Sequence, residues 1–155
     1  MAHGGRALVR MSPEEVDSFL ADSMKLQVGT VNADGSPHLT TLFYVVQDGR
    51  LAFWTYGSSQ KIRNLERDAR ISCLVETGDD YFELRGVSIQ GEARLVRDED
   101  GIRRIGTAVA GRMANGADLG EIGRAEVERQ VRKRVGVLVT PYRTASWDHS
   151  KMTNQ

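Results

Sequence analysis

Apolar and polar residues alternate along much of the chain, in short runs separated by Gly, Asp and Asn. Alternation with a period of two is typical of β-strands that bury one face. The dipeptide Asp48-Gly49, which lies between two such runs, predicts a β-hairpin. The pattern predicts six strands, at residues 25–31, 37–46, 51–56, 70–76, 81–96 and 135–148.

Other segments have helical patterns. Ser12 and Glu15 form the capping signature of a first helix, whose apolar side chains then recur every three to four residues. A short helix is expected over residues 59–68. Residues 98–134 are helical and charged around a Gly-rich middle, 111–123, which is either a lid or a connector between helices.

Strands in hairpin order with short helices between them predict a mainly β, α+β fold, organised as a small antiparallel barrel. Gly86 and Gly91 inside the long fifth strand indicate the bends that a closing barrel requires. The length of 155 residues fits one domain, so we expect a single domain over 1–155. Residues 1–11 are expected to be a flexible N-terminal segment.

Composition excludes several classes of partner. The 21 basic residues equal the 21 acidic ones, so net charge gives no electrostatic reason to expect nucleic acid or a membrane surface. No apolar run approaches the ~20 residues that span a bilayer. The single cysteine, Cys73, excludes an internal disulfide and lies in an apolar run, where a buried, unreactive thiol is expected. These features predict a cytoplasmic protein.

Most catalytic motifs are missing from the sequence. The chain has three histidines, His3, His38 and His149, and their spacing is not that of metal ligands. It also has no cysteine cluster, so no metal site is predicted. The sequence also lacks a Gly-x-Ser-x-Gly elbow, a complete P-loop and a Gly-x-Gly-x-x-Gly turn after a strand. Serine hydrolase, nucleotide hydrolase and Rossmann dinucleotide chemistry are therefore not expected.

The stretch FWTYGSSQKIRNLERDARISCLV, residues 53–75, carries the strongest remaining signal. The first backbone N–H groups of its helix have no internal partner, and the helix dipole favours an anion there. Ser58 and Ser59 add hydroxyl donors, and Lys61 adds a full charge, with Asn64 on the same helix face. Two interpretations stay open: a phosphate-sized anion site, or a capped surface helix with a solvated lysine.

The order of these segments resembles that of a known superfamily. The succession of FWTYGSSQK, a helix, RISCLVE and QGEARLV is similar to the pyridoxamine-phosphate-oxidase-like, FMN-binding split β-barrel superfamily. Within it, KIRNLERDARIS resembles the Lys-x-Arg-Asn-Leu-x-x-Asp-x-Arg-x-Ser pattern of the branch that uses the deazaflavin F420. The resemblance implies a six-stranded split barrel that pairs as a homodimer, with each cofactor in a groove at the interface.

The resemblance also implies where the cofactor binds. The superfamily holds the cofactor phosphate at the end of the third strand and the start of the helix, and the ring along the second strand. The expected cofactor-binding residues are therefore Thr40 and Thr41 on the second strand, and Thr55, Ser58, Ser59, Lys61 and Asn64 around the helix start.

Several departures separate this chain from true pyridoxamine-phosphate oxidases. The strand HLTTLFY lacks the arginine and lysine of those oxidases, Gln60 replaces a common arginine, and their C-terminal substrate signature is absent. We therefore expect coenzyme F420 as the cofactor of an oxidoreductase that transfers a hydride between the deazaflavin and a small conjugated organic substrate. The alternatives are an FMN-binding oxidoreductase of the same fold and a non-catalytic F420-binding carrier.

No catalytic side chain is singled out by the sequence. Tyr44, Tyr142 and His149 are unranked candidates for a proton donor. The C-terminal SWDHSKM has two interpretations: either Trp147 and His149 reach across the dimer to the partner's substrate face, or the segment is a poorly ordered tail.

Overall fold

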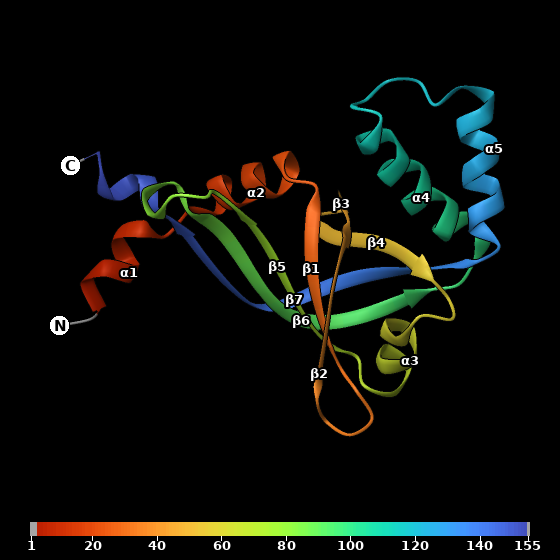
Figure 1. The fold of residues 1–155 in the computed structure, drawn as a ribbon, viewed down its shortest axis with the longest axis horizontal. Coiled ribbons are helices and arrows are strands. Elements are labelled where there is room, and N and C mark those ends of the chain that lie inside the picture. The colour runs from red at the N-terminus through yellow and green to blue at the C-terminus, as the bar shows by residue number, and fades with distance from the viewer. Residues whose placement is uncertain (1–2, 155) are drawn as a thin grey trace.

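A computed structural model describes residues 3–154 of the chain. Its centre is an antiparallel sheet of seven strands in the order β2-β1-β5-β6-β7-β4-β3 (Figure 1). The strands are β1 Lys25–Val31, β2 Pro37–Phe43, β3 Val45–Gln47, β4 Arg50–Tyr56, β5 Arg70–Thr77, β6 Arg85–Val96 and β7 Arg134–Asp148.

The two edge strands of this sheet come from one continuous stretch of sequence. Only Tyr44 separates β2 from β3, yet β2 pairs with β1 and β3 pairs with β4. A sheet whose first and last strands are joined by one residue must curl round on itself, so the strands form a barrel that is split between β2 and β3. The sequence predicts one strand over 37–46. Its division at Tyr44 is why the structure has seven strands instead of six.

Tyr44 holds this split in place. The residue is 1% exposed, its backbone N–H donates to the Met24 carbonyl at 3.2 Å, and its phenol donates to the Leu20 carbonyl at 2.5 Å. The Arg112 guanidinium donates to the Tyr44 carbonyl at 3.0 Å and lies 5.2 Å from the centre of its ring. Burial raises the pKa of the phenol to about 12. The residue is therefore part of the core and not an available proton donor.

Helices flank the barrel on several sides (Figure 1). The capping box that Ser12 and Glu15 predict is present, with the Glu15 amide 3.1 Å from the Ser12 hydroxyl. The helix expected over 59–68 is α3. The helices are α1 His3–Val9, α2 Pro13–Asp22, α3 Gln60–Arg67, α4 Glu99–Met113 and α5 Gly120–Val131, with 3₁₀ turns η1 Tyr81–Glu83 and η2 His149–Met152.

One local expectation is wrong: the fifth strand begins at Arg85 and not at residue 81, because residues 81–83 form the 3₁₀ turn η1. Within the N-terminal segment 1–11, residues 3–9 form helix α1. The C-terminal segment after β7 forms η2, in which the Asp148 carboxylate accepts from the Ser150 amide at 3.0 Å. The end of the described chain is thus held by local hydrogen bonds.

The barrel interior is the main hydrophobic core. Alternate residues of β1, β4, β5, β6 and β7 point into it, and α2 and α3 add the buried side chains Phe19, Leu20, Ile62 and Leu65. Cys73 lies in this core, where burial raises the pKa of its thiol to about 12. The expectation of a buried, unreactive cysteine is confirmed.

The outer face of the sheet is covered on one half. Helices α4 and α5 pack on the side of β3, β4 and β7 that includes Trp54 and Leu138. A Cβ on Gly106 of α4 would lie 2.2 Å from the Trp54 ring, so only glycine allows this close approach. The other half of the outer face, over β2, β1, β5 and β6, exposes residues such as Leu39 and Ser72. Among residues 3–154, no helix combines the length and hydropathy needed to cross a membrane.

Replacing Tyr44 by Phe should lower the free energy of unfolding by about 1–3 kcal/mol, because the buried Leu20 carbonyl loses its donor. Denaturant unfolding measures this change. The matched control is Tyr142→Phe, at a side chain that is 67% exposed, and it should change stability by less than about 0.5 kcal/mol. Equal stability of the wild-type protein and Tyr44→Phe would show that the split is not held by this hydrogen bond.

Candidate functional site

Helix α3 begins directly after β4, in a turn fixed by backbone hydrogen bonds. The Gly57 amide donates to the Lys133 carbonyl at 2.9 Å, and the Ser59 amide donates to the Tyr56 carbonyl at 3.0 Å. Ser59 has extended backbone angles and caps the helix by accepting from the Ile62 amide at 3.4 Å. The amides of Gln60 and Lys61 have no hydrogen-bond partner within residues 3–154. The expected helix start is therefore present, with donors available to a ligand.

Two cations meet beside this helix start. Lys61 is partly buried, and burial followed by the nearby positive charge of Arg134 lowers the pKa of its ammonium. Neither side chain forms an ion pair with a carboxylate in the described part of the chain. Two adjacent cations without a counter-charge repel each other, and a bound anion would relieve this repulsion.

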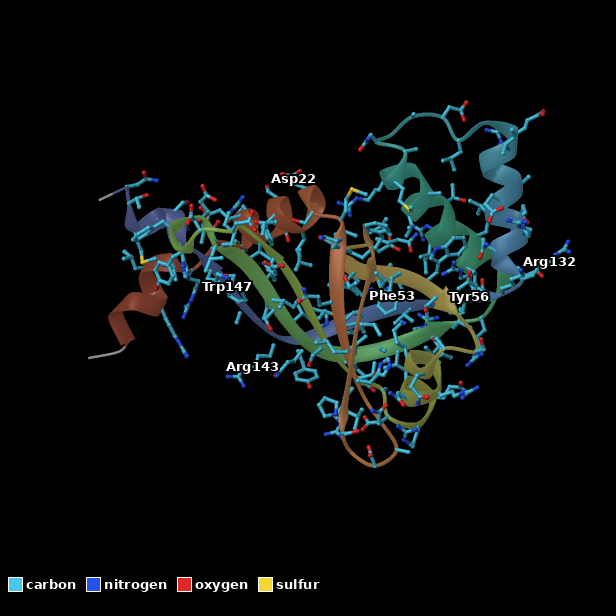
Figure 2. All side chains as sticks on the ribbon, in the orientation of Figure 1. Asp22, Phe53, Tyr56, Arg132, Arg143 and Trp147 are labelled. Atoms are coloured by element: carbon cyan, nitrogen blue, oxygen red, sulfur yellow. The ribbon has the colours of Figure 1, made fainter. Side chains whose placement is uncertain are left out.

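Arg134 is held rigidly at this corner. It begins β7, opposite Tyr56 of β4, and its guanidinium lies 3.9 Å from the centre of the Tyr56 ring. Its Nε donates to the side-chain oxygen of Gln130 at 3.1 Å, and the Trp54 ring centre is 5.2 Å away. Figure 2 shows Tyr56 at this end of the barrel, below the C-terminal end of α5. A stacked, hydrogen-bonded guanidinium needs little further ordering to bind an anion.

The sequence does not identify Arg134. It lies in the basic run RQVRKR, next to acidic residues, where a solvated helix face is the expected interpretation. The helix ends at Val131, and Arg134 is already in a strand. Only the pairing of β4 with β7, which joins residues about eighty positions apart, brings Arg134 to Tyr56 and Lys61.

Three of the predicted residues, Ser58, Ser59 and Lys61, meet at this corner. Ser58 is exposed and Ser59 caps the helix. Thr55 precedes them in β4, but it is only 6% exposed and pairs with Val135. Because side chains alternate along a strand, Thr55 shares the inner face with the buried Phe53.

Asn64 has a structural role within the chain. Its side chain is fully buried and donates to the Thr30 hydroxyl at 3.0 Å and to the Asn32 oxygen at 2.9 Å. Its own oxygen accepts from Gln60 at 2.8 Å and from Arg67 at 3.2 Å. Both donors and both acceptor sites of the amide are thus used within the chain. Asn64 ties α3 to β1 and so positions Lys61.

Thr40 and Thr41 point to opposite faces of β2, so a planar ring along the strand cannot contact both side chains on one face. Thr40 is partly buried and its hydroxyl oxygen has no hydrogen-bond partner within residues 3–154. Thr41 is exposed on the open outer face.

Of the remaining candidate donors, Tyr142 lies on the surface near Arg70, just after the end of α3, whereas His149 lies far from α3. Tyr142 is 67% exposed, and His149 in η2 has its Nδ1 2.8 Å from the Tyr81 carbonyl. β7 has 15 residues, so at about 3.3 Å per residue its two ends are roughly 50 Å apart before any bending. Figure 1 shows α3 and the C-terminal end of β7 at opposite ends of the molecule. Within one chain, His149 cannot serve a ligand held by Lys61.

Replacing Arg134 by Gln should raise the pKa of Lys61 toward its ordinary value, because the neighbouring positive charge is removed. An NMR titration of the lysine side-chain resonances measures the shift. The matched control is Arg132→Gln, an exposed arginine two residues earlier, and it should leave Lys61 unaffected. Identical Lys61 titration curves in the wild-type protein and Arg134→Gln would show that the two cations do not share a site.

Comparison with solved structures shows how widely this fold occurs. A conserved hypothetical protein from Mycobacterium tuberculosis is 39% identical, with a TM-score of 0.88 over 96% of this chain and 91% of that chain. An F420 reductase is 18% identical, with a TM-score of 0.60 over 86% of this chain and 98% of that chain. The heme storage protein HutZ from Vibrio cholerae is 19% identical, with a TM-score of 0.68 over 91% of this chain and 99% of that chain.

At 18% and 19% identity, the similarities to the F420 reductase and to HutZ show the fold alone. No curated protein matches the sequence. Residues 12–148 match the family model described as pyridoxamine 5'-phosphate oxidase, and this range covers all seven strands and helices α2 to α5. On this match, the chain belongs to the pyridoxamine 5'-phosphate oxidase family.

Proposed function

We propose that this protein is an F420-dependent oxidoreductase that works as a homodimer in the cytoplasm and exchanges a hydride with a small conjugated organic substrate. The observation that carries the proposal is the corner formed by Lys61 and Arg134 beside the free amides of α3. This corner offers charge-assisted hydrogen bonds of the kind that bind a phosphate. F420 and FMN both have a phosphate on the chain attached to a planar ring: it is the terminal group in FMN, and in F420 it is a diester that leads on to the rest of the molecule.

The choice of F420 over FMN rests on the sequence around the corner. The helix segment KIRNLERDARIS resembles the deazaflavin-using branch, and β2 lacks the arginine and lysine of the FMN-dependent oxidases. A bound deazaflavin would supply the hydride chemistry, so the absence of a catalytic triad from the sequence agrees with the proposal.

The chain's own residues would bind and orient the cofactor. The Ser58 hydroxyl, the amides of Gln60 and Lys61, and the two cations would hold the anionic end. Asn64 keeps α3 on β1, so the anion site stays at a fixed distance from β2. The ring would lie along β2, where Thr41 is exposed to the outside. The corner would thus form one end of the cofactor site and β2 would form one wall, while the opposite wall is open.

A second copy of the chain is proposed to supply that wall. On the uncovered half of the outer face, Leu39, Gly29, Ser72 and Gln90 lie side by side on β2, β1, β5 and β6. Leu39 is 73% exposed and Phe43 of the same strand 39% exposed, which is unusual for large apolar residues on one sheet face. The small residues beside them leave a flat surface on which a second sheet can pack.

Titration of the cofactor-free protein with F420 and, separately, with FMN tests the cofactor. Protein made in a host without F420 should purify colourless and then bind added F420, with the change followed by cofactor fluorescence. Hydride transfer to a panel of conjugated acceptors then separates an enzyme from a carrier. A yellow preparation with tightly bound FMN would favour the FMN-dependent alternative, and F420 binding without any turnover would favour the carrier.

Replacing Lys61 by Ala should weaken F420 binding by about 1.5–3 kcal/mol, the range for charge-assisted hydrogen bonds. The same variant should bind the phosphate-free deazaflavin as the wild-type protein does, because only the anionic end contacts the corner. Arg63→Ala, which removes an exposed cation from the same helix, is the matched control. If Lys61→Ala weakened the binding of F420 and of the phosphate-free deazaflavin equally, the phosphate would have to bind away from Lys61.

Replacing Ser72 by Arg should convert the protein from a dimer to a monomer, because the long cation would enter the centre of the proposed interface. Light scattering after size-exclusion chromatography measures the mass. Thr107→Arg adds the same side chain on the exposed surface of α4 and should stay dimeric. A monomeric wild-type protein, or a dimeric Ser72→Arg variant, would contradict this interface.

A further inference from the structure

A pocket of about 160 Å³ lies between helix α2 and the hairpin formed by β3 and β4. Figure 1 shows α2 and β3 side by side at the upper edge of the barrel. The floor of the pocket consists of buried aliphatic side chains from α2, β4, β6 and β7, namely Leu20, Leu51, Ile89 and Val139. An apolar cavity of about 150 Å³ holds one benzene-sized ring, so this pocket has room for a single ring or a branched aliphatic group.

The pocket is separate from the anion corner and from the proposed dimer interface. Neither Lys61 nor Arg134 lines it. Ile89 and Val139 belong to the core inside the barrel. Gln90, which follows Ile89, points to the outer face, because side chains alternate along a strand. The pocket therefore opens from the inner side of the sheet, and the proposed interface lies on the outer side.

The walls of the pocket are fixed by the fold. The Tyr44 phenol donates to the Leu20 carbonyl at 2.5 Å and so ties α2 to the strand that begins at Val45. On the opposite side, Pro141 of β7 faces Gly91 of β6, where the register of the two strands shifts. A bulge of this kind bends the strand. The pocket thus lies beside a built-in bend and needs no ligand to shape it.

Two opposite charges line the same pocket from different elements. Arg50 at the start of β4 is partly buried, and Asp17 of α2 is exposed. Neither forms an ion pair, with the other or with any further residue of the described chain. Asp48, the acid nearest to Arg50 in the sequence, is paired with Arg104 at 3.3 Å. A pocket this small therefore presents an apolar floor, one free cation and one free anion to a single ligand.

We propose that this pocket binds a hydrophobic α-amino acid: its side chain enters the apolar floor, its carboxylate binds Arg50 and its ammonium binds Asp17. A guanidinium matches a carboxylate with paired hydrogen bonds, and the floor removes the apolar side chain from water. A ligand with only one charge would leave either Arg50 or Asp17 without a partner. The proposal does not depend on the proposed oxidoreductase activity or on a bound cofactor.

Titration of the full-length protein, followed by NMR of its backbone amides, tests the pocket with two matched series of probes. Each series contains an amino acid, L-phenylalanine or L-leucine, its amide, which lacks the carboxylate, and its deaminated acid, which lacks the ammonium. At about pH 6 the carboxylates and the amines are both charged. At least one of the two amino acids should bind about tenfold or more tightly than its amide and its deaminated acid. L-serine, which has no apolar group, should bind more weakly as well.

Variants then assign each charge of the ligand to its partner. Arg50→Gln should remove the preference for the amino acid over its amide, and Asp17→Asn should remove the preference over the deaminated acid. Both variants should bind the amino acid about tenfold more weakly, while Arg132→Gln and Asp79→Asn, at exposed residues outside the pocket, should bind it as the wild-type protein does. Circular dichroism checks that each variant is folded. The proposal is overturned if neither amino acid binds, if L-serine binds as tightly, or if either pocket variant keeps the preference that it should lose.

Discussion

The structure depends on a single constraint: one stretch of chain, residues 37–47, supplies both edges of the sheet, and the buried Tyr44 joins them. The hydrogen bonds of its backbone and phenol hold the two edges to α2 and to the loop before β1. The sheet therefore has to close, and closure creates an interior that α2 and α3 seal. It also leaves an outer face that α4 and α5 cover only in part.

Closure also explains where the proposed anion site lies. β4 ends beside the start of β7, so the helix that follows β4 begins next to Arg134. Lys61 on that helix and Arg134 on that strand are two cations without a counter-charge, and burial and mutual repulsion lower the pKa of Lys61. A neutral ligand would not relieve this repulsion, whereas an anion would. The corner is thus better suited to a phosphate than to any uncharged group.

The sequence predicts local features well and long-range ones poorly. The capping box at Ser12, the helix after the Ser-Ser turn and most strand limits follow from neighbouring residues, which the sequence shows directly. The division of a strand at Tyr44 depends on the pairing of distant strands, and so does the approach of Arg134 to Lys61. Asn64 lies on the predicted helix, but spacing along a helix cannot show that its amide meets Thr30.

The most direct test of the account is a crystal structure of the protein with F420 bound. The account predicts that a phosphate oxygen lies within about 2.7–3.2 Å of the Lys61 ammonium and of the Arg134 guanidinium, with further contacts to the first amides of α3. The ring should then lie along β2. A structure in which this corner holds no part of the cofactor, while the cofactor is clearly bound elsewhere, would contradict the central claim.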